Sequence, residues 1–199
     1  MKIKDIICNI RPIQNLNKMK ILKKILIIVA VILIIPVVLC VIALFISKDF
    51  AVERGITINR PKQDVFNYIK FIKNQDNYSK WMAMDPNAKK TYTGTDGTVG
   101  FVSGWESNNK ELGTGTQTIR TIAEGDSLVV DLHFIKPFDN KATGYMITSD
   151  EGGKTKVRWG MRGNMPYPFN VMKLFMNMEK AGGDDLGTGL ANLKALLEK

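Results

Sequence analysis

The chain has 199 residues, of which 45% are apolar and 24% charged, and it carries a formal net charge of +9, two cysteines and one histidine. Cys8 and Cys40 are too few for a disulfide framework. With His133 as the single histidine, two-histidine zinc sites, Cys/His zinc knuckles and two-histidine iron sites are excluded within one chain, so we expect no metal and no cofactor.

The positive charge is concentrated at the N-terminus. Residues 1–24 carry seven basic side chains and one acidic side chain, residues 25–46 carry no charge, and the rest of the chain mixes both signs in similar numbers. A protein that binds nucleic acid concentrates basic residues on its folded body, because phosphate neutralisation supplies the affinity. We therefore expect no nucleic-acid partner and interpret residues 1–24 as a basic cytoplasmic tail.

Residues 25–46 form an apolar run of 22 residues, ILIIVAVILIIPVVLCVIALFI. As a helix this run is roughly 33 Å long, which matches the hydrocarbon core of a bilayer. A cleaved signal peptide is the alternative, but its apolar stretch is shorter and ends in small residues, whereas this run ends in Leu44, Phe45 and Ile46. We therefore predict a single transmembrane helix and a membrane partner, with the N-terminus in the cytoplasm and the C-terminal domain outside it.

The pattern becomes periodic after the apolar run. Residues 51–58 alternate as in a strand, and a turn that ends at Pro61 precedes a helix with Val65, Phe66, Ile69 and Ile72 on one face. Residues 74–86 are predicted to be irregular. Five strands are then expected between Gly, Asp and Asn turns, at residues 98–106, 112–123, 128–135, 141–149 and 155–162.

The strand at residues 128–135 shows clear alternation. Leu128, Val130, Leu132 and Phe134 share one face, and His133 lies on the other. A sheet with one apolar face needs a cover. The sequence offers helices at residues 168–180 and 186–197, which we expect to be divided by residues 181–183 (Ala-Gly-Gly).

The second of these helices has a narrow leucine stripe at residues 186, 190, 193 and 197, suited to lying on a sheet. The order of elements predicts an α+β helix-grip fold, in which an antiparallel sheet wraps round a long C-terminal helix and leaves a cavity. One transmembrane helix precedes this domain, which covers residues 47–199.

Several segments of this domain occur in a recognisable order. Residues 52–69 read VERGITINRPKQDVFNYI, Trp81 is followed by Asp85-Pro86, Trp105 precedes a Gly-x-Gly at residues 113–115, and residues 183–194 read GDDLGTGLANLK. Together they resemble the START-like, or SRPBCC, superfamily and in particular its polyketide cyclase/dehydrase branch. The resemblance covers about residues 50–199. It implies the helix-grip fold and a range of activities, from lipid carriers and secondary-metabolite binders to aromatic cyclases.

Few side chains indicate acid–base chemistry. His133 is expected to be a solvated strand residue, because it lies opposite the apolar face. Glu106, Glu111 and Arg120 flank the Trp105 hairpin, but nothing in the sequence fixes them in a cavity. Asp184 and Asp185 are more simply explained as the cap of a helix than as a metal pair. We assign no catalytic residue.

Methionine and aromatic residues favour binding instead. Methionines gather near the last strand and helix, where they either fill the core or line a ligand site. The expected function is a membrane-anchored START-like domain that binds a lipid or another hydrophobic small molecule. A cyclase-like enzyme and an envelope protein that acts through protein contacts are the alternatives. The residues expected to contact the ligand are Trp81, Met84, Trp105, Phe134, Trp159, Met161, Met172, Phe175 and Met176.

Overall fold

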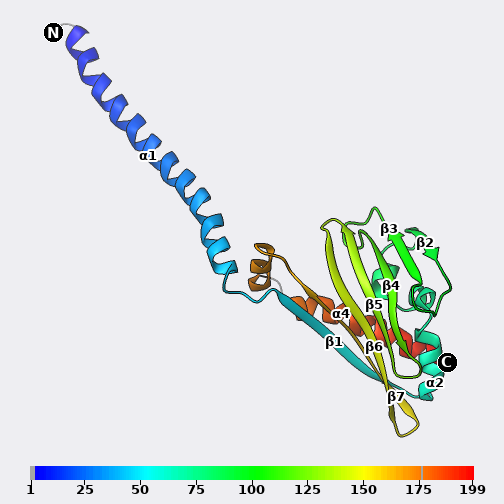
Figure 1. Ribbon diagram of the computed structural model, residues 1–199. Helices are drawn as coiled ribbons and strands as arrows, with labels where there is room; N and C mark the ends of the chain where they lie inside the picture. The colour runs from blue at the N-terminus through cyan, green and yellow to red at the C-terminus, as the bar shows by residue number, and fades with distance from the viewer. Residues whose placement is uncertain (1–2, 176) are drawn as a thin grey trace. The chain divides into compact units, whose positions relative to one another are not determined.

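The structure, a computed structural model, describes residues 3–175 and 177–199. They divide into two compact units, which we call the anchor unit and the sheet domain. The anchor unit consists of Met1–Ile46 with Tyr167–Val171, and the sheet domain consists of Ser47–Pro166 with Met172–Lys199. Figure 1 traces the chain from helix α1 to helix α4.

The anchor unit is dominated by helix α1, Ile3–Ala43. Its part from Met19 to Ala43 is long and apolar enough to cross a membrane, and the most apolar 18-residue stretch of that part contains no buried residue. The helix also includes much of the basic N-terminal stretch. It ends at Ala43 rather than at the predicted residue 46, because the backbone N–H groups of Leu44 and Phe45 turn back to carbonyls three residues earlier.

Asn170 closes the C-terminal end of α1. Its side-chain amide nitrogen donates to the carbonyl oxygens of Ala43 at 2.7 Å and Ile46 at 2.8 Å. The last carbonyls of a helix have no partner within it, so this amide satisfies groups that would otherwise need water or another donor. Asn170 is fully buried in this position.

The sheet domain contains one antiparallel sheet of seven strands in the order β1-β7-β6-β5-β4-β3-β2 (Figure 1). Strand β2 was not predicted, because it is short, lies at the edge and is mostly exposed, and so lacks apolar alternation. The strands are β1 Asp49–Ile58, β2 Lys89–Thr93, β3 Val102–Glu106, β4 Thr114–Ala123, β5 Ser127–Lys136, β6 Asn140–Glu151 and β7 Lys154–Asn164.

Short helices connect β1 to β2. Helix α2, Lys62–Ile69, buries Val65, Phe66 and Ile69 as the sequence predicts. Residues 74–86, predicted to be irregular, contain the end of a 3-10 helix, η1 at Ile72–Asn77, and one turn of α-helix, α3 at Lys80–Ala83. Such short turns carry too little periodicity to be recognised from sequence.

Helix α4, Met178–Leu197, begins where the Asn177 side chain accepts from the backbone N–H of Lys180 at 2.8 Å. It runs unbroken through Gly182 and Gly183, so the predicted break is wrong. A Cβ on Gly183 would lie 2.1 Å from the Arg54 guanidinium, which shows how closely the helix approaches β1. Contact with the sheet therefore keeps this glycine pair helical, and the acidic residues that follow lie inside the helix instead of capping it.

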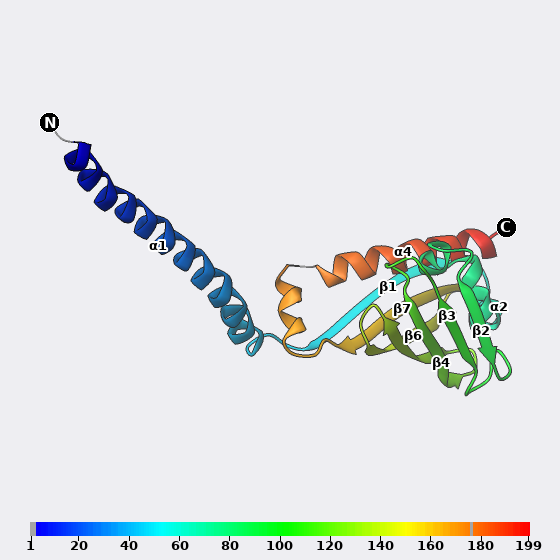
Figure 2. The same ribbon diagram turned by 90° about the horizontal axis from the view of Figure 1, so that it is seen from above.

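The segment before α4 also differs from the prediction. Residues 168–180 were expected to form a helix, but the structure has a short 3-10 helix, η2 at Phe169–Leu174, before α4 begins. Figure 2 shows α4 lying along one face of the sheet. Its leucines Leu186, Leu190 and Leu193 are buried in the core with residues of β1 and β7. This is the predicted α+β helix-grip fold.

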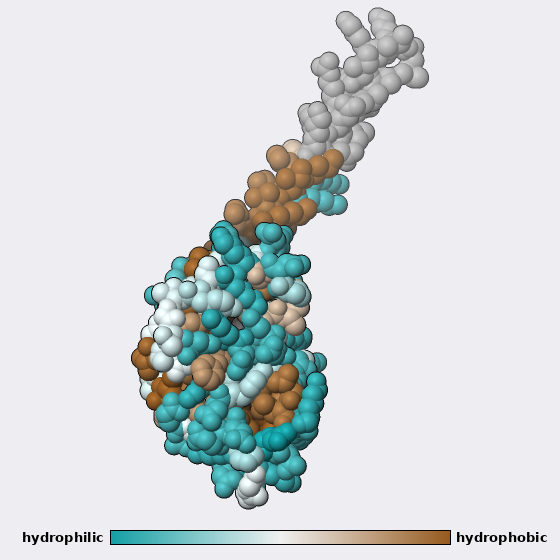
Figure 3. Space-filling model, turned by 90° about the vertical axis from the view of Figure 1, so that its right-hand side faces the viewer, coloured by the Kyte–Doolittle hydropathy of each residue, from teal (hydrophilic) through white to brown (hydrophobic). Residues whose placement is uncertain are grey.

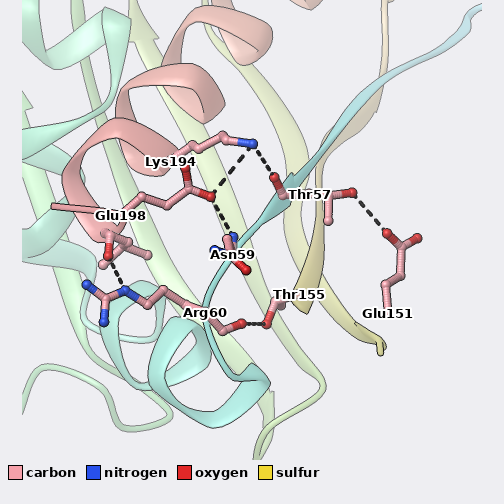
Figure 4. Close-up of polar contacts among 8 residues, drawn as sticks. Thr57, Asn59, Arg60, Glu151, Thr155, Lys194 and Glu198 are labelled. Carbon is pink, nitrogen blue, oxygen red and sulfur yellow. Dashed lines mark hydrogen bonds and ion pairs between the residues drawn. The ribbon is translucent and has the colours of Figure 1, made fainter. Parts of the chain in front are cut away.

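Polar contacts fix the C-terminal end of α4 against the end of β1 (Figure 4). The Lys194 ammonium donates to the Thr57 carbonyl at 2.8 Å, and a Glu198 carboxylate oxygen accepts from the Asn59 backbone N–H at 2.5 Å. The Arg60 guanidinium donates to a carbonyl in the last turn of the helix. These groups hold one end of the helix in register with the sheet.

Two glycines of α4 test whether the close approach of helix and sheet matters. A Cβ on Gly189 would lie 2.6 Å from the Trp159 ring, whereas a Cβ on Gly187 would meet nothing within 4 Å. We expect Gly189→Ala to lower the free energy of unfolding by about 1–3 kcal/mol through overpacking. Gly187→Ala should raise it by about 0.5–1 kcal/mol through helix propensity.

The measurement is urea unfolding of the detergent-solubilised chain, followed by tryptophan fluorescence. Gly187→Ala is the matched control, because it makes the same chemical change in the same helix. Equal effects of the two substitutions would show that α4 does not rest on Trp159 as described.

Candidate functional site

A cavity of about 420 Å³ lies in the sheet domain between the sheet and the helices. One wall is the inner face of β5, where Leu128, Val130, Leu132 and Phe134 follow one another at every second position. Further walls come from η1, α3, β4, β6, β7 and α4. The alternation predicted for residues 128–135 is confirmed, and its apolar face is the face that lines the cavity.

The cavity exists because the helices cover only part of the sheet. The larger core cluster joins α4 and α2 to β1, β6 and β7, and includes Val52, Phe66, Trp159 and Leu190. A second, smaller cluster of buried side chains joins η1 to β4 and β5. The inner faces of β4 and β5 are therefore covered in part by η1, and side chains of the same faces line the cavity.

Aromatic side chains form much of the lining. Trp81 from α3 contacts Trp159 from β7 edge-on, with ring centroids 5.9 Å apart, and Trp105 from β3 contacts Phe134 from β5 at 6.3 Å. The Trp105 indole nitrogen donates to the Leu112 carbonyl at 3.2 Å, so its polar group is satisfied by the protein. These rings offer apolar surface with fixed orientation.

Tyr78 lies beneath this aromatic wall. Its ring meets Trp159 at 5.6 Å, and its hydroxyl donates weakly to the Met146 sulfur at 3.6 Å. Burial, with a smaller contribution from Tyr68, raises the pKa of Tyr78 far above its usual value. The phenol therefore stays neutral at any physiological pH and acts as a core residue.

Charged groups on the lining are paired or exposed. The Lys80 ammonium contacts the Asp185 carboxylate at 2.5 Å, and this hydrogen bond together with the charge of Asp185 raises the pKa of Lys80. Glu111 and Lys136 are exposed. Two amides, Gln75 and Gln117, are buried against the cavity and bonded to each other.

The structure brings together five of the nine residues predicted to contact a ligand. The five that line the cavity are Trp81, Trp105, Phe134, Trp159 and Met161.

The other four predicted residues are not among the described residues of the lining. Met84 is half-buried in the loop after α3, where its carbonyl accepts from Asn109. Met172 and Phe175 are 42% and 72% exposed, because their segment is not part of α4. Met176 lies outside the described residues.

Sequence reasoning missed the polar residues of the lining. Gln117 lies in β4 two positions from buried Ile119, so the alternation of that strand contained the signal. Gln75 and Ser79 lie in the segment predicted to be irregular and had no pattern to reveal them. Asp185 was interpreted as a helix cap, whereas it pairs with Lys80.

The candidate acid–base residues lie elsewhere. His133 is on the outer face of β5, where its Nε2 is 3.2 Å from an Asp139 carboxylate oxygen. Arg120 pairs with Asp131 at 2.9 Å, and Glu106 is exposed. Of the charged residues named from the sequence, Glu111 and Asp185 touch the cavity.

Comparison with known proteins agrees with this architecture. A sequence model of the family described as polyketide cyclase/dehydrase and lipid transport matches residues 49–198. No protein with a curated description matches the chain significantly.

Similar solved structures show the same fold at low sequence identity. Protein MLL2253 from Mesorhizobium loti has a TM-score of 0.54 at 12% identity, over 75% of this chain and 97% of that one. Ara h 8.0201 has a TM-score of 0.51 at 14% sequence identity, and the match covers 76% of this chain and 99% of that one. The di-domain ARO/CYC protein StfQ from the steffimycin biosynthetic pathway has a TM-score of 0.56 at 10% sequence identity. The match covers 75% of this chain and 50% of the StfQ chain.

Proposed function

We propose, from the premise that this chain belongs to the polyketide cyclase/dehydrase and lipid-transport family, that it binds a hydrophobic small molecule while anchored in a membrane. The observation that carries the proposal is the cavity of about 420 Å³ with aromatic and aliphatic walls. Its volume lies within the roughly 300–1,000 Å³ of ligand pockets. Each Å² of apolar ligand surface buried there contributes about 25 cal/mol.

The side chains of the lining favour binding over catalysis. Acid–base catalysis needs a titratable group within hydrogen-bond reach of the reacting atoms. Glu111 is exposed, Asp185 is held by Lys80, and Tyr78 stays neutral below the wall. Shape and apolar contact are therefore the properties that this cavity offers a ligand.

The membrane anchor is the second part of the proposal. Figure 3 shows a brown, hydrophobic stretch of α1 with a small teal patch at its side, whereas the visible face of the sheet domain is largely teal and white with smaller brown areas. Asn170, from a distant part of the sequence, binds the carbonyls at the end of this helix. Cleavage of the helix would remove the groups that Asn170 binds, so this contact supports an uncleaved anchor over a signal peptide.

Aromatic residues near the end of the helix support the same interpretation. Phe45 is 86% exposed, and Tyr167 and Phe169 of the anchor unit are also exposed. Tyrosine, with its amphipathic ring, is enriched where a helix leaves the bilayer, and exposed phenylalanines add apolar surface there. By the positive-inside rule, the lysines before residue 25 support a cytoplasmic N-terminus and a sheet domain outside the cytoplasm.

The ligand-binding proposal is tested by filling the cavity. Leu132→Trp places a larger ring in the lining, whereas Ile135→Trp makes a similar change on the exposed outer face of the same strand. We expect Leu132→Trp to weaken binding of 8-anilinonaphthalene-1-sulfonate about tenfold, which corresponds to roughly 1.4 kcal/mol. Ile135→Trp should bind like the wild type.

The titration uses the full chain in phosphatidylglycerol nanodiscs, whose negative charge repels the anionic probe from the lipid. Fluorescence of the probe is read against empty nanodiscs. No saturable binding to the wild type, or equal weakening by both substitutions, would contradict a ligand site in this cavity.

The anchor is tested by alkaline carbonate extraction of membranes and N-terminal sequencing of the retained protein. We expect the chain to stay in the membrane pellet with residues 1–46 intact, because an uncharged helix of this length does not leave lipid. A soluble chain that begins after residue 46 would show that the helix is a signal peptide.

A further inference from the structure

Three uncharged polar residues of the cavity lining are almost fully buried. Gln75 and Ser79 come from η1 and the residues after it, and Gln117 comes from β4. Their exposed fractions are 8%, 3% and 6%. Burial of amides costs free energy unless their hydrogen bonds are made, so their presence here needs an explanation.

The hydrogen bond between the two side-chain amides uses only one polar group of each. The Gln117 side-chain nitrogen donates to the Gln75 side-chain oxygen at 3.1 Å. This leaves the Gln75 nitrogen as a donor and the Gln117 oxygen as an acceptor. If both amides are turned over, the bond reverses and the pair still presents one donor and one acceptor.

These remaining groups face open space. Among the residues that the structure describes, Asn170 Oδ1 is the one side-chain polar atom that is both sealed by protein and without a hydrogen bond. The Gln75 nitrogen and the Gln117 oxygen are therefore not sealed. Both residues line the cavity, so the cavity is the space into which the two groups open.

The three buried polar residues carry no charge, and the charged group paired close to them, Asp185, is neutralised by Lys80. None of these three residues forms an ion pair, and the charged residues of the lining, Glu111, Lys136 and Asp185, come from other segments. A carboxylate placed beside two amides would lose its hydration without gaining a countercharge. An uncharged hydroxyl fits better, because it accepts one hydrogen bond and donates one.

We propose that the amide pair Gln75–Gln117 binds the hydroxyl group of an otherwise apolar, uncharged ligand. The hydroxyl accepts from the Gln75 amide nitrogen and donates to the Gln117 amide oxygen, while the ligand body lies against the aromatic wall. Ser79 supplies a further hydroxyl at the same end. This inference rests on the proposed function and names its ligand class: hydrophobic molecules with a neutral hydroxyl, in preference to hydrocarbons and to carboxylates.

The test compares ligands that differ by one group. Naphthalene, 2-naphthol and 2-naphthoate compete with 8-anilinonaphthalene-1-sulfonate for the full chain in phosphatidylglycerol nanodiscs. The measured quantity is the ratio of the apparent affinity for 2-naphthol to that for naphthalene. This ratio is compared between the wild type and the double variant Gln75→Leu/Gln117→Leu. Partition of each ligand into lipid cancels between proteins, because the same nanodiscs are used.

We expect the ratio to fall about fivefold in the double variant, as the loss of a buried hydrogen bond predicts. Affinity for naphthalene should stay the same or rise, and 2-naphthoate should bind more weakly than 2-naphthol to the wild type. Gln63→Leu, on the exposed surface of α2, is the matched control and should leave the ratio unchanged.

An unchanged ratio in the double variant, or tighter binding of 2-naphthoate than of 2-naphthol, would overturn the inference and leave the proposed function standing. Failure of the probe to bind the wild type would overturn both. Removal of both partners of a buried hydrogen bond is better tolerated than removal of one. If the leucine variant does not fold, Gln75→Met/Gln117→Met gives the same comparison with more flexible side chains.

Discussion

The structure depends on how one helix covers one sheet. One face of the sheet carries the strand residues of the hydrophobic core, and an apolar face exposed to water must be covered. Helix α4 meets this need on β1 and β7, with its leucines buried against Trp159 and Val52. The strands β4 and β5 lie further along the sheet, and inner side chains of both line the cavity. The proposed ligand site is this incompletely covered part of the sheet.

The parts of the fold that depend on local pattern were predictable from sequence. The alternation of residues 128–134 indicated both the strand and its inner face, and the uncharged run from residue 25 indicated the long apolar helix. Features that depend on contacts between residues distant in the sequence were not predictable. The Gly182–Gly183 pair predicts a break, yet the helix continues because it lies on β1. The exposure of Phe175 likewise depends on where α4 begins.

The candidate site likewise has a part that the sequence indicated and a part that it did not. Its aromatic wall was indicated by residue type, because large rings in a small domain must be buried somewhere. Its polar end was not indicated, because Gln75 lies in a 3-10 helix and contacts Gln117, which is 42 residues away in the sequence, only in the folded structure. A glutamine in a strand is usually explained by exposure to solvent, and only the three-dimensional structure shows that this one is buried.

The central claim is that the space beside α4 holds a small molecule. Native mass spectrometry of the full chain, purified in mild detergent from its membrane, tests it most directly. The account predicts a discrete mass above that of the polypeptide, which disappears when the Leu132 side chain is enlarged to tryptophan. A wild-type spectrum with the polypeptide mass alone, or the same added mass in both proteins, would contradict it.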